Sequence, residues 1–428
     1  MSEEQFFQIF LERIRETLSR LNPVDFNNSI FTNAYLSKWN AFGETIKPQG
    51  AIVACDGSFG ESSFSGGLVV IVARAIAHIY SLNDNRITSV FEVDTKAGYR
   101  LEGRTLFMKT LELRVLRRAL EKALEEHIEA FGIFDGSLYL TFLHHKDRLK
   151  KISSVFEDYV RELSNILKLA EKGVKIIGVS KDSDINYLRA KVVTSVLTEL
   201  CKGMSNGIAR RRSLKKLLKD ITSKGLECLD ESIRSLCLRE LEQDFSDEGL
   251  YSELTLEPGF TTPLLLAPQT IFLTGESKAN GWRDTSFRRH IGKDEDLSGV
   301  LKSLDEYFSS TPIALTYWKP PNMSVVYRLD VPASLLGYSG KCEDLTEDVF
   351  LEGRDYLESM KNIVGVLNWM RHGPYAVYPI VEVDSIAKLD RSLYKSAYEP
   401  VIVEELKKRG FKVNPRKRKI RDIVLRGY

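Results

Sequence analysis

Two Asp-Gly-Ser tripeptides in this sequence follow apolar segments that are typical of buried strands. Asp56 comes after the run AIVAC, and Asp135 comes after AFGIF. A single Asp-Gly-Ser is common in turns, because aspartate caps the turn and glycine accepts a positive φ. Two copies, each after a buried strand, are harder to explain as turns alone. A third carboxylate, Glu112, lies beside the apolar stripe of a helical segment, although taken alone it is better explained as a solvated helix residue.

Three carboxylates brought together would repel one another strongly at low dielectric, so a divalent cation is their natural partner. The sequence offers no Cys-x-x-Cys pair and no histidine cluster, and hard oxygen ligands favour Mn²⁺ or Mg²⁺ over zinc. Two such ions, about 3.5–4 Å apart, activate a water and stabilise the leaving oxygen in phosphodiester hydrolysis. The residue types therefore predict a two-ion hydrolytic centre formed by Asp56, Glu112 and Asp135.

These carboxylates can meet only if the elements that carry them fold together. The expected order is three strands, then helix, strand, helix, strand and helix, at 51–58, 65–82, 88–95, 104–127, 130–140, about 149–172, 173–183 and about 184–201. This order is the ribonuclease H-like plan, an α/β fold with a mixed sheet flanked by helices. In that plan the first and fourth strands are neighbours. Asp56 and Asp135 would then meet at the ends of their strands, and Glu112 could point back towards them.

The length of 428 residues exceeds that of one typical domain, which predicts either one large core with insertions or two domains. We divide the chain into an N-terminal helix with its lead-in, the first part of the core, a mostly helical middle insertion, and a C-terminal part that completes the core, at 1–50, 51–201, 202–265 and 266–428. The last part should add strands at 270–275, 312–319 and 324–332, helices at about 345–370 and 378–393, and a basic tail.

The net charge is only +2, from 61 basic and 59 acidic residues, so contact with nucleic acid must come from local patches. Five scattered cysteines fit a reducing compartment. The N-terminal segment is an amphipathic helix with acidic residues, unlike a signal peptide, and the longest apolar run is too short to span a bilayer. We therefore expect a cytoplasmic protein without a membrane segment.

Several basic residues are candidates for contact with DNA phosphates. Lys181 follows the fifth strand on the carboxylate edge, where it could neutralise the charge of the scissile phosphate or simply be a solvated loop residue. Charge runs are usually solvated faces, but two of them are further candidates: Arg210, Arg211 and Arg212 with Lys215 and Lys216, and the tail residues 416–419. The apolar residues within 420–425 would suit docking onto a partner or completing the domain's own core.

Six segments resemble the successive motifs of the NurA nucleases: AIVACDGS, LELRVLRRALE, IFDGSLY, GVSKDS, VYRLDVP and YPIVEVDSIAK, which together span about residues 51–390. The resemblance implies a manganese-dependent DNA nuclease of archaea and bacteria, with 5'–3' exonuclease and single-strand endonuclease activity. It also implies a homodimer around a DNA channel. This dimer would work with a hexameric ATPase of the HerA type in DNA end resection, double-strand break repair and homologous recombination.

Carried over to this chain, the resemblance assigns three metal-binding carboxylates, Asp56, Glu112 and Asp135. The family usually has a histidine after a Tyr-Pro-apolar segment, but after Tyr378 this sequence places Asp384 at that position. Aspartate binds the same hard metals. His372, six residues before Tyr378, is a rival, so the fourth ligand stays open between Asp384 and His372.

The resemblance also bears on the segment VYRLDVP. It favours Tyr327 and Arg328 as residues of the DNA channel, the tyrosine stacking on a base and the arginine binding a phosphate through two nitrogens. The surface of a paired strand would explain both residues as well.

Two other functions compete with the nuclease. An actin-like phosphotransferase or ATPase also uses Asp-Gly turns after strands, but the two turns here are close enough in the chain to belong to one subdomain, and no Gly-x-x-x-x-Gly-Lys-Ser/Thr loop is present. A catalytically silent, dimeric DNA-binding adaptor is favoured only by the replacement at Asp384. The three core carboxylates argue against it, because clustering them without a metal is costly.

Overall fold

The computed structural model describes residues 3–19, 29–126, 129–140, 146–181, 183–200, 214, 217–219, 230–243, 245–255, 257–268 and 282–413. Within these residues eleven strands form one mixed sheet in the order β1-β7-β9-β10-β6-β5-β2-β3-β4, with β8 beside β9 and β11 beside β8. The strands are β1 Trp39–Ala41, β2 Ala51–Ser63, β3 Leu68–Ser81, β4 Ile87–Tyr99, β5 Ala130–Asp135, β6 Lys175–Ser180, β7 Gly259–Thr261, β8 Leu264–Leu265, β9 Ile313–Lys319, β10 Tyr327–Pro332 and β11 Val349–Phe350.

Five neighbouring strands form the predicted core. β2, β3 and β4 are an antiparallel ribbon, and β5 and β6 continue the sheet on the other side of β2 as parallel strands. Parallel neighbours need a long crossover connection, which a helix supplies between β5 and β6. The order β4-β3-β2-β5-β6 confirms the ribonuclease H-like α/β fold with a mixed sheet flanked by helices.

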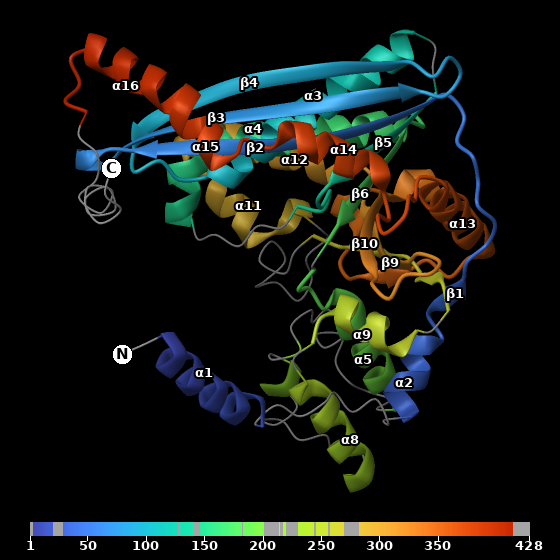
Figure 1. Ribbon diagram of the computed structural model, residues 1–428. Coiled ribbons are helices and arrows are strands. Elements are labelled where there is room, and N and C mark those ends of the chain that lie inside the picture. The colour runs from blue at the N-terminus through green and yellow to red at the C-terminus, as the bar shows by residue number, and fades with distance from the viewer. Residues whose placement is uncertain are drawn as a thin grey trace.

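Helices cover both faces of this core (Figure 1). α3 (Arg104–Glu125) and α4 (Lys146–Glu171) lead from β4 to β5 and from β5 to β6. Their apolar side chains share one buried cluster with those of α12 (Ser298–Phe308). On the opposite face, α13 (Arg354–Trp369) and α14 (Tyr378–Ala387) share a second cluster with alternate residues of β5 and β6. The sheet is therefore the middle layer of three.

The other helices with six or more described residues are α1 Glu3–Leu18, α2 Ser29–Leu36, α5 Tyr187–Leu200, α8 Glu231–Glu242, α9 Asp247–Leu254, α11 Ser286–Ile291 and α16 Glu399–Lys408; a single turn, α15, spans Arg391–Leu393. α8 and α9 lie in the middle segment, and β7 and β8 near its end join the main sheet. The strand expected at 270–275 lies outside the described residues. None of the described helices is long and apolar enough to cross a bilayer.

β2 is longer than the sequence suggested. We expected this strand to end with its Asp-Gly-Ser, but β2 pairs with β3 from Ala51 to Ser63. Its parallel pairing with β5 ends earlier, at Cys55 with Phe134. The placement of Asp56 at the end of its strand was therefore wrong, because β3 continues to supply backbone partners. Asp56 instead marks the point where β2 loses its parallel neighbour.

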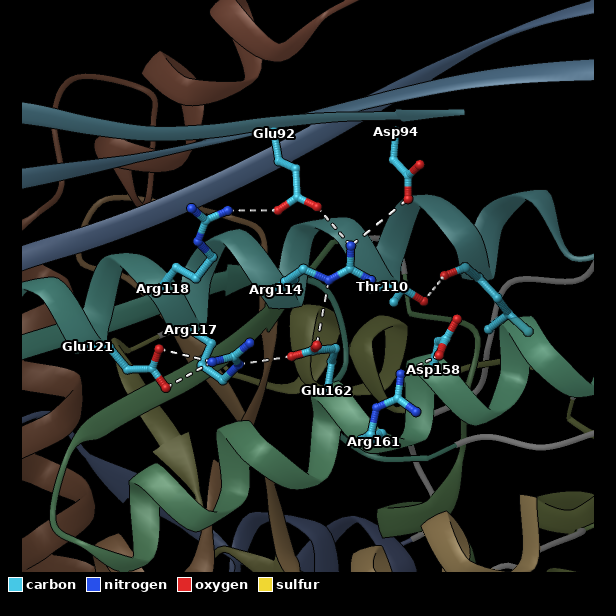
Figure 2. Close-up of polar contacts among 11 residues, drawn as sticks. Glu92, Asp94, Thr110, Arg114, Arg117, Arg118, Glu121, Asp158, Arg161 and Glu162 are labelled. Atoms are coloured by element: carbon cyan, nitrogen blue, oxygen red, sulfur yellow. Dashed lines mark hydrogen bonds and ion pairs between the residues drawn. The ribbon is translucent and has the colours of Figure 1, made fainter. Parts of the chain in front are cut away.

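Charged side chains occupy the space between β4, α3 and α4 (Figure 2). Arg114 of α3 donates to Glu92 of β4 over 2.8 Å, and Arg117 donates to Glu162 of α4 over 2.9 Å. Arg114 also lies 3.6 Å from Glu162, so one network joins all three elements. Helix positions two residues apart lie about 200° apart around the axis. Anchoring Arg114 to β4 therefore turns Glu112 to the other side of α3.

We predict that Glu162→Gln lowers the free energy of unfolding by about 1.5–3 kcal/mol, because the buried carboxylate accepts a charge-assisted hydrogen bond. Glu121→Gln is the matched control: Glu121 also pairs with Arg117, at 2.9 Å, but is 41% exposed, so its loss should cost about 0.5 kcal/mol or less. Urea denaturation of both variants measures the difference. Equal losses would show that the network does not hold α3 in place.

Candidate metal centre

Asp56 of β2 and Asp135 of β5 lie at the same level of these neighbouring strands. Each is one residue beyond the last parallel pair that joins the two strands. Directly after Asp135, Gly136 takes a φ of 149°, in the region that favours glycine. A Cβ atom on Gly178 of β6 would lie 2.5 Å from the carbonyl oxygen of Gly136. The turn that carries Asp135 can therefore lie against β6 only because position 178 has no side chain.

Glu112 reaches the same place from α3. A Cβ atom on Gly57 would lie 2.8 Å from its Cγ and 3.0 Å from its Oε1, so glycine beside Asp56 lets the Glu112 side chain lie against β2. Glu112 is 1% exposed, and neither of its carboxylate oxygens has a hydrogen-bond partner in the structure. The ammonium of Lys109 lies 2.8 Å from Oε2 as an ion pair. The expectation that Glu112 points towards the strand residues agrees with this geometry.

Asp384 approaches from α14, on the other face of the sheet. The end of this helix is fixed to the ribbon: Ser58 accepts a hydrogen bond from the Leu389 amide over 2.8 Å and donates to the Ala387 carbonyl, and Arg74 donates to the same carbonyl over 2.7 Å. Asp384 lies about one turn before these anchors and interacts with Asp56 directly.

His372 takes a different position from Asp384. It is exposed, and its ring packs edge-to-face on Tyr378 at 5.2 Å between centroids. Of the two rival fourth ligands, the structure thus brings Asp384 to Asp56.

The proximity of these carboxylates changes their acidity. Burial raises the pKa of Asp56 to about 6; the Gly57 amide opposes this rise, whereas Asp384 and Asp135 add to it. Burial likewise raises the pKa of Glu112 to about 7, against the opposing charge of Lys109 and with contributions from Asp56 and Asp135. The neighbouring anions thus make Asp56 and Glu112 harder to ionise, so positive charge would stabilise the centre.

Two lysines supply part of that charge. Lys181, directly after β6, pairs with Asp135 over 3.1 Å and is 47% exposed, on the predicted edge of the sheet. Lys109 pairs with Glu112 and donates to the carbonyl oxygen of Asp135 over 2.8 Å. The sequence analysis missed Lys109. Its position three residues before Glu112, which puts both side chains on one face of α3, was the available signal.

The structure corrects the expectation for Arg328. This side chain is buried, and its guanidinium donates to both carboxylate oxygens of Asp330 over 2.8 and 3.0 Å and to Ser137 over 3.0 Å. Asp330 also accepts the backbone amide of Tyr139 over 3.2 Å. Arg328 therefore holds the loop that follows Asp135 from within the core, and it is not available to a DNA phosphate.

Tyr327, the other residue expected in the channel, is half-buried. Its ring packs on Trp318 at 5.8 Å between centroids, which suits a strand surface. Its contact with DNA stays a prediction. Arg210, Arg211, Arg212, Lys215, Lys216 and the tail residues 416–425 lie outside the described residues.

The donor chemistry of this centre fits a hard divalent cation. Carboxylates come from β2, β5, α3 and α14, and Glu112 offers two buried oxygens without hydrogen bonds. In the part of the chain that the structure describes, no three Asp, Glu, His or Cys side chains are already close enough to form a metal-binding group. Mutual repulsion and pairing with lysine oppose such convergence, and a cation would relieve the repulsion.

Comparison with known proteins identifies the family of this chain. The family model described as the NurA domain matches residues 50–389, most of the chain. The chain belongs to the NurA family. A solved structure of a NurA protein is named as that of a nuclease. No curated protein matches the chain.

Among solved structures, the NurA nuclease from Sulfolobus solfataricus is similar, with 13% identity, coverage of 95% of this chain and 98% of that one, and a TM-score of 0.47. A NurA structure bound to dAMP and manganese has 14% identity, 94% and 96% coverage, and a TM-score of 0.38. Endonuclease V from Ciona intestinalis has 10% identity, 92% and 99% coverage, and a TM-score of 0.26. Because these scores are low, membership in the NurA family rests on the domain match.

The raised pKa values predict a pH dependence for the metal-free NurA-family protein. Between about pH 4 and pH 7 the folded state binds protons at Asp56 and Glu112 that the unfolded state has released. Their contribution to stability is therefore present at low pH and lost as the pH rises through this window. The unfolding temperature, measured in EDTA, should fall less between pH 5 and pH 7.5 in Glu112→Gln than in wild type. Glu125→Gln, at an exposed position of the same helix, is the control and should match wild type. If the unfolding temperature of Glu112→Gln falls with pH as steeply as that of wild type, the prediction is contradicted.

Proposed function

We propose that this NurA-family chain is a divalent-metal-dependent deoxyribonuclease that hydrolyses phosphodiester bonds, with Asp56, Glu112, Asp135 and Asp384 as its metal-binding carboxylates. The observation that supports the proposal most is the burial of Glu112 near Asp56 and Asp135, where burial and these neighbouring charges raise its pKa to about 7 in spite of its ion pair with Lys109. A stable fold has little reason to keep such a group unless a cation binds it. The cofactor is Mn²⁺ or Mg²⁺, as two ions.

The residues of the centre divide the chemical work. A bound divalent cation supplies the Lewis acid that activates water and stabilises the leaving oxygen. Asp56 and Asp384 would hold it from the α14 face of the sheet, and Glu112 would hold it from α3. The half-exposed Lys181 is close enough to Asp135 to bind the phosphate that enters beside that carboxylate, which places it in the catalytic set.

The finer assignments follow the family. A NurA structure with dAMP and manganese suggests a DNA-derived substrate and Mn²⁺ as the ion. We propose 5'–3' exonuclease and single-strand endonuclease activity in DNA end resection, in double-strand break repair together with a HerA-type hexameric ATPase. Cys55 and Cys237 are free and buried, which suits the cytoplasmic location that we propose.

We also propose that the protein forms a homodimer, and β4 supports this. The strand is at the end of the sheet, and its polarity is reversed: Glu92 faces the protein's own helices, whereas Phe91 and Val93 on the outer face are 73% and 55% exposed. A second copy of the chain, related by a twofold axis, would cover the same apolar face with its own.

Asp56→Asn tests the nuclease proposal. Cleavage of labelled DNA in Mn²⁺ should fall by about a hundredfold or more, because the variant loses a ligand and not merely a supporting residue. Metal-free Asp56→Asn should be at least as stable as wild type, since repulsion by Asp135 and Asp384 is removed. Asp84→Asn, in the turn between β3 and β4, is the control and should cut normally. Cleavage by Asp56→Asn at the wild-type rate would refute the site. A folded wild type that never cuts, alone or with its ATPase, would favour the silent adaptor.

Phe91→Glu tests the dimer. Sedimentation velocity should change from dimer to monomer, because a charge at the centre of an apolar interface must be buried without a partner. Val401→Glu on α16 is the matched control, at an apolar position that is 59% exposed on another element, and it should stay dimeric. A monomeric wild type, or a dimeric Phe91→Glu, would reject β4 as the contact.

A further inference from the structure

Lys109 occupies an unusual position for a lysine next to a metal centre. It extends from α3 into the group of carboxylates, where its ammonium lies 2.8 Å from Glu112 Oε2 and 2.8 Å from the carbonyl oxygen of Asp135. The same ammonium lies 5.0 Å from the centre of the Phe134 ring, within the range of a cation–π contact. Only 26% of the side chain is exposed.

The space for this ammonium is built into the backbone. A Cβ atom on Gly136 would lie 3.3 Å from Lys109 Nζ, so the absence of a side chain there leaves room for the lysine. Gly57 similarly lets Glu112 lie against β2, which keeps its carboxylate within reach of Lys109. Two glycines thus allow the ion pair to form inside the centre rather than in solvent.

We infer that Lys109 is the resident counter-cation of the centre: its ammonium neutralises Glu112 in the metal-free protein and competes with the divalent ion for that carboxylate. In the described structure Lys109 is paired with Glu112 over 2.8 Å, so its ammonium offsets the burial of that carboxylate. A divalent ion on Glu112 would face repulsion from an ammonium a few ångströms away, so the lysine must move aside when the ion binds. Lys109 therefore stabilises the empty centre and weakens its affinity for metal.

This inference rests on the proposed metal site, and it makes a prediction that an essential metal-positioning lysine would not share. Lys109→Met, which keeps the length of the side chain without its charge, should unfold at a lower temperature than wild type in EDTA. The same variant should bind Mn²⁺ about tenfold more tightly in isothermal titration calorimetry, which corresponds to about 1.4 kcal/mol of removed competition. Lys109→Arg, which keeps the charge, should resemble wild type in both measurements.

The matched control is Lys122→Met in the last turn of the same helix, about 20 Å along the axis from Lys109. It should change neither the Mn²⁺ affinity nor the metal-free stability. If Lys109→Met does not fold, Lys109→Gln serves in its place. In the Glu112→Gln background the same substitution at Lys109 should no longer lower the unfolding temperature, because the anion that it neutralises is gone.

The outcomes separate this inference from the proposed function. Wild type that binds no Mn²⁺ contradicts the metal site itself, whereas the stability measurements in EDTA still test the pairing of Lys109 with Glu112. If wild type binds Mn²⁺ at least as tightly as a folded Lys109→Met or Lys109→Gln variant does, the competition between Lys109 and the ion is contradicted, but the metal site is not. If the Lys109 substitution lowers the unfolding temperature equally in the wild-type and Glu112→Gln backgrounds, Lys109 is not the counter-cation of Glu112.

Discussion

The cost of gathering negative charge in a dry interior is the constraint on which the rest of this structure depends. Asp56, Asp135, Glu112 and Asp384 come from four elements and lie near the point where β2 loses its parallel neighbour. Burial raises the pKa of Asp56 and of Glu112, and the charges of neighbouring carboxylates add to both shifts. Such a group persists only if cations attend it and if the surrounding fold is stable enough to bear the repulsion.

The fold meets this constraint away from the centre. The thirteen-residue pairing of β2 with β3 fixes Asp56 from one side, and the ion pairs between β4, α3 and α4 fix the helix that carries Glu112 from the other. Arg328 and Asp330 form a buried pair that holds the loop after Asp135. Glycines at 57 and 178 then permit the close approach of side chain and backbone. Rigidity outside the centre thus allows unfavourable charge within it.

Local pattern was enough to predict the core and part of the site. Apolar runs that end in Asp-Gly-Ser predicted the strands of Asp56 and Asp135, and the leucine stripe predicted the helix of Glu112. The length of β2 was not predictable, because pairing with β3 over residues of low apolar content decides where the strand ends. The burial of Arg328 depends on Asp330 and Ser137, the latter far away in the chain, and sequence alone cannot show that contact. Lys109 lies in no recognisable motif, because its role depends on contacts of its ammonium with both Glu112 and the Asp135 carbonyl oxygen.

The limits of the NurA match have a physical explanation in the same contacts. The matched region begins at residue 50, just before Ala51 opens β2, and ends at residue 389, where the Leu389 amide donates to Ser58 on that strand. The match thus begins one residue before β2 and ends at a residue hydrogen-bonded to Ser58, two residues beyond Asp56 on that strand. α14 carries Asp384 and can reach Asp56 only if the chain returns to β2 and is fastened there by Ser58 and Arg74. A shorter domain would lack that carboxylate, whereas the described residues that follow, up to 413, pack along the ribbon.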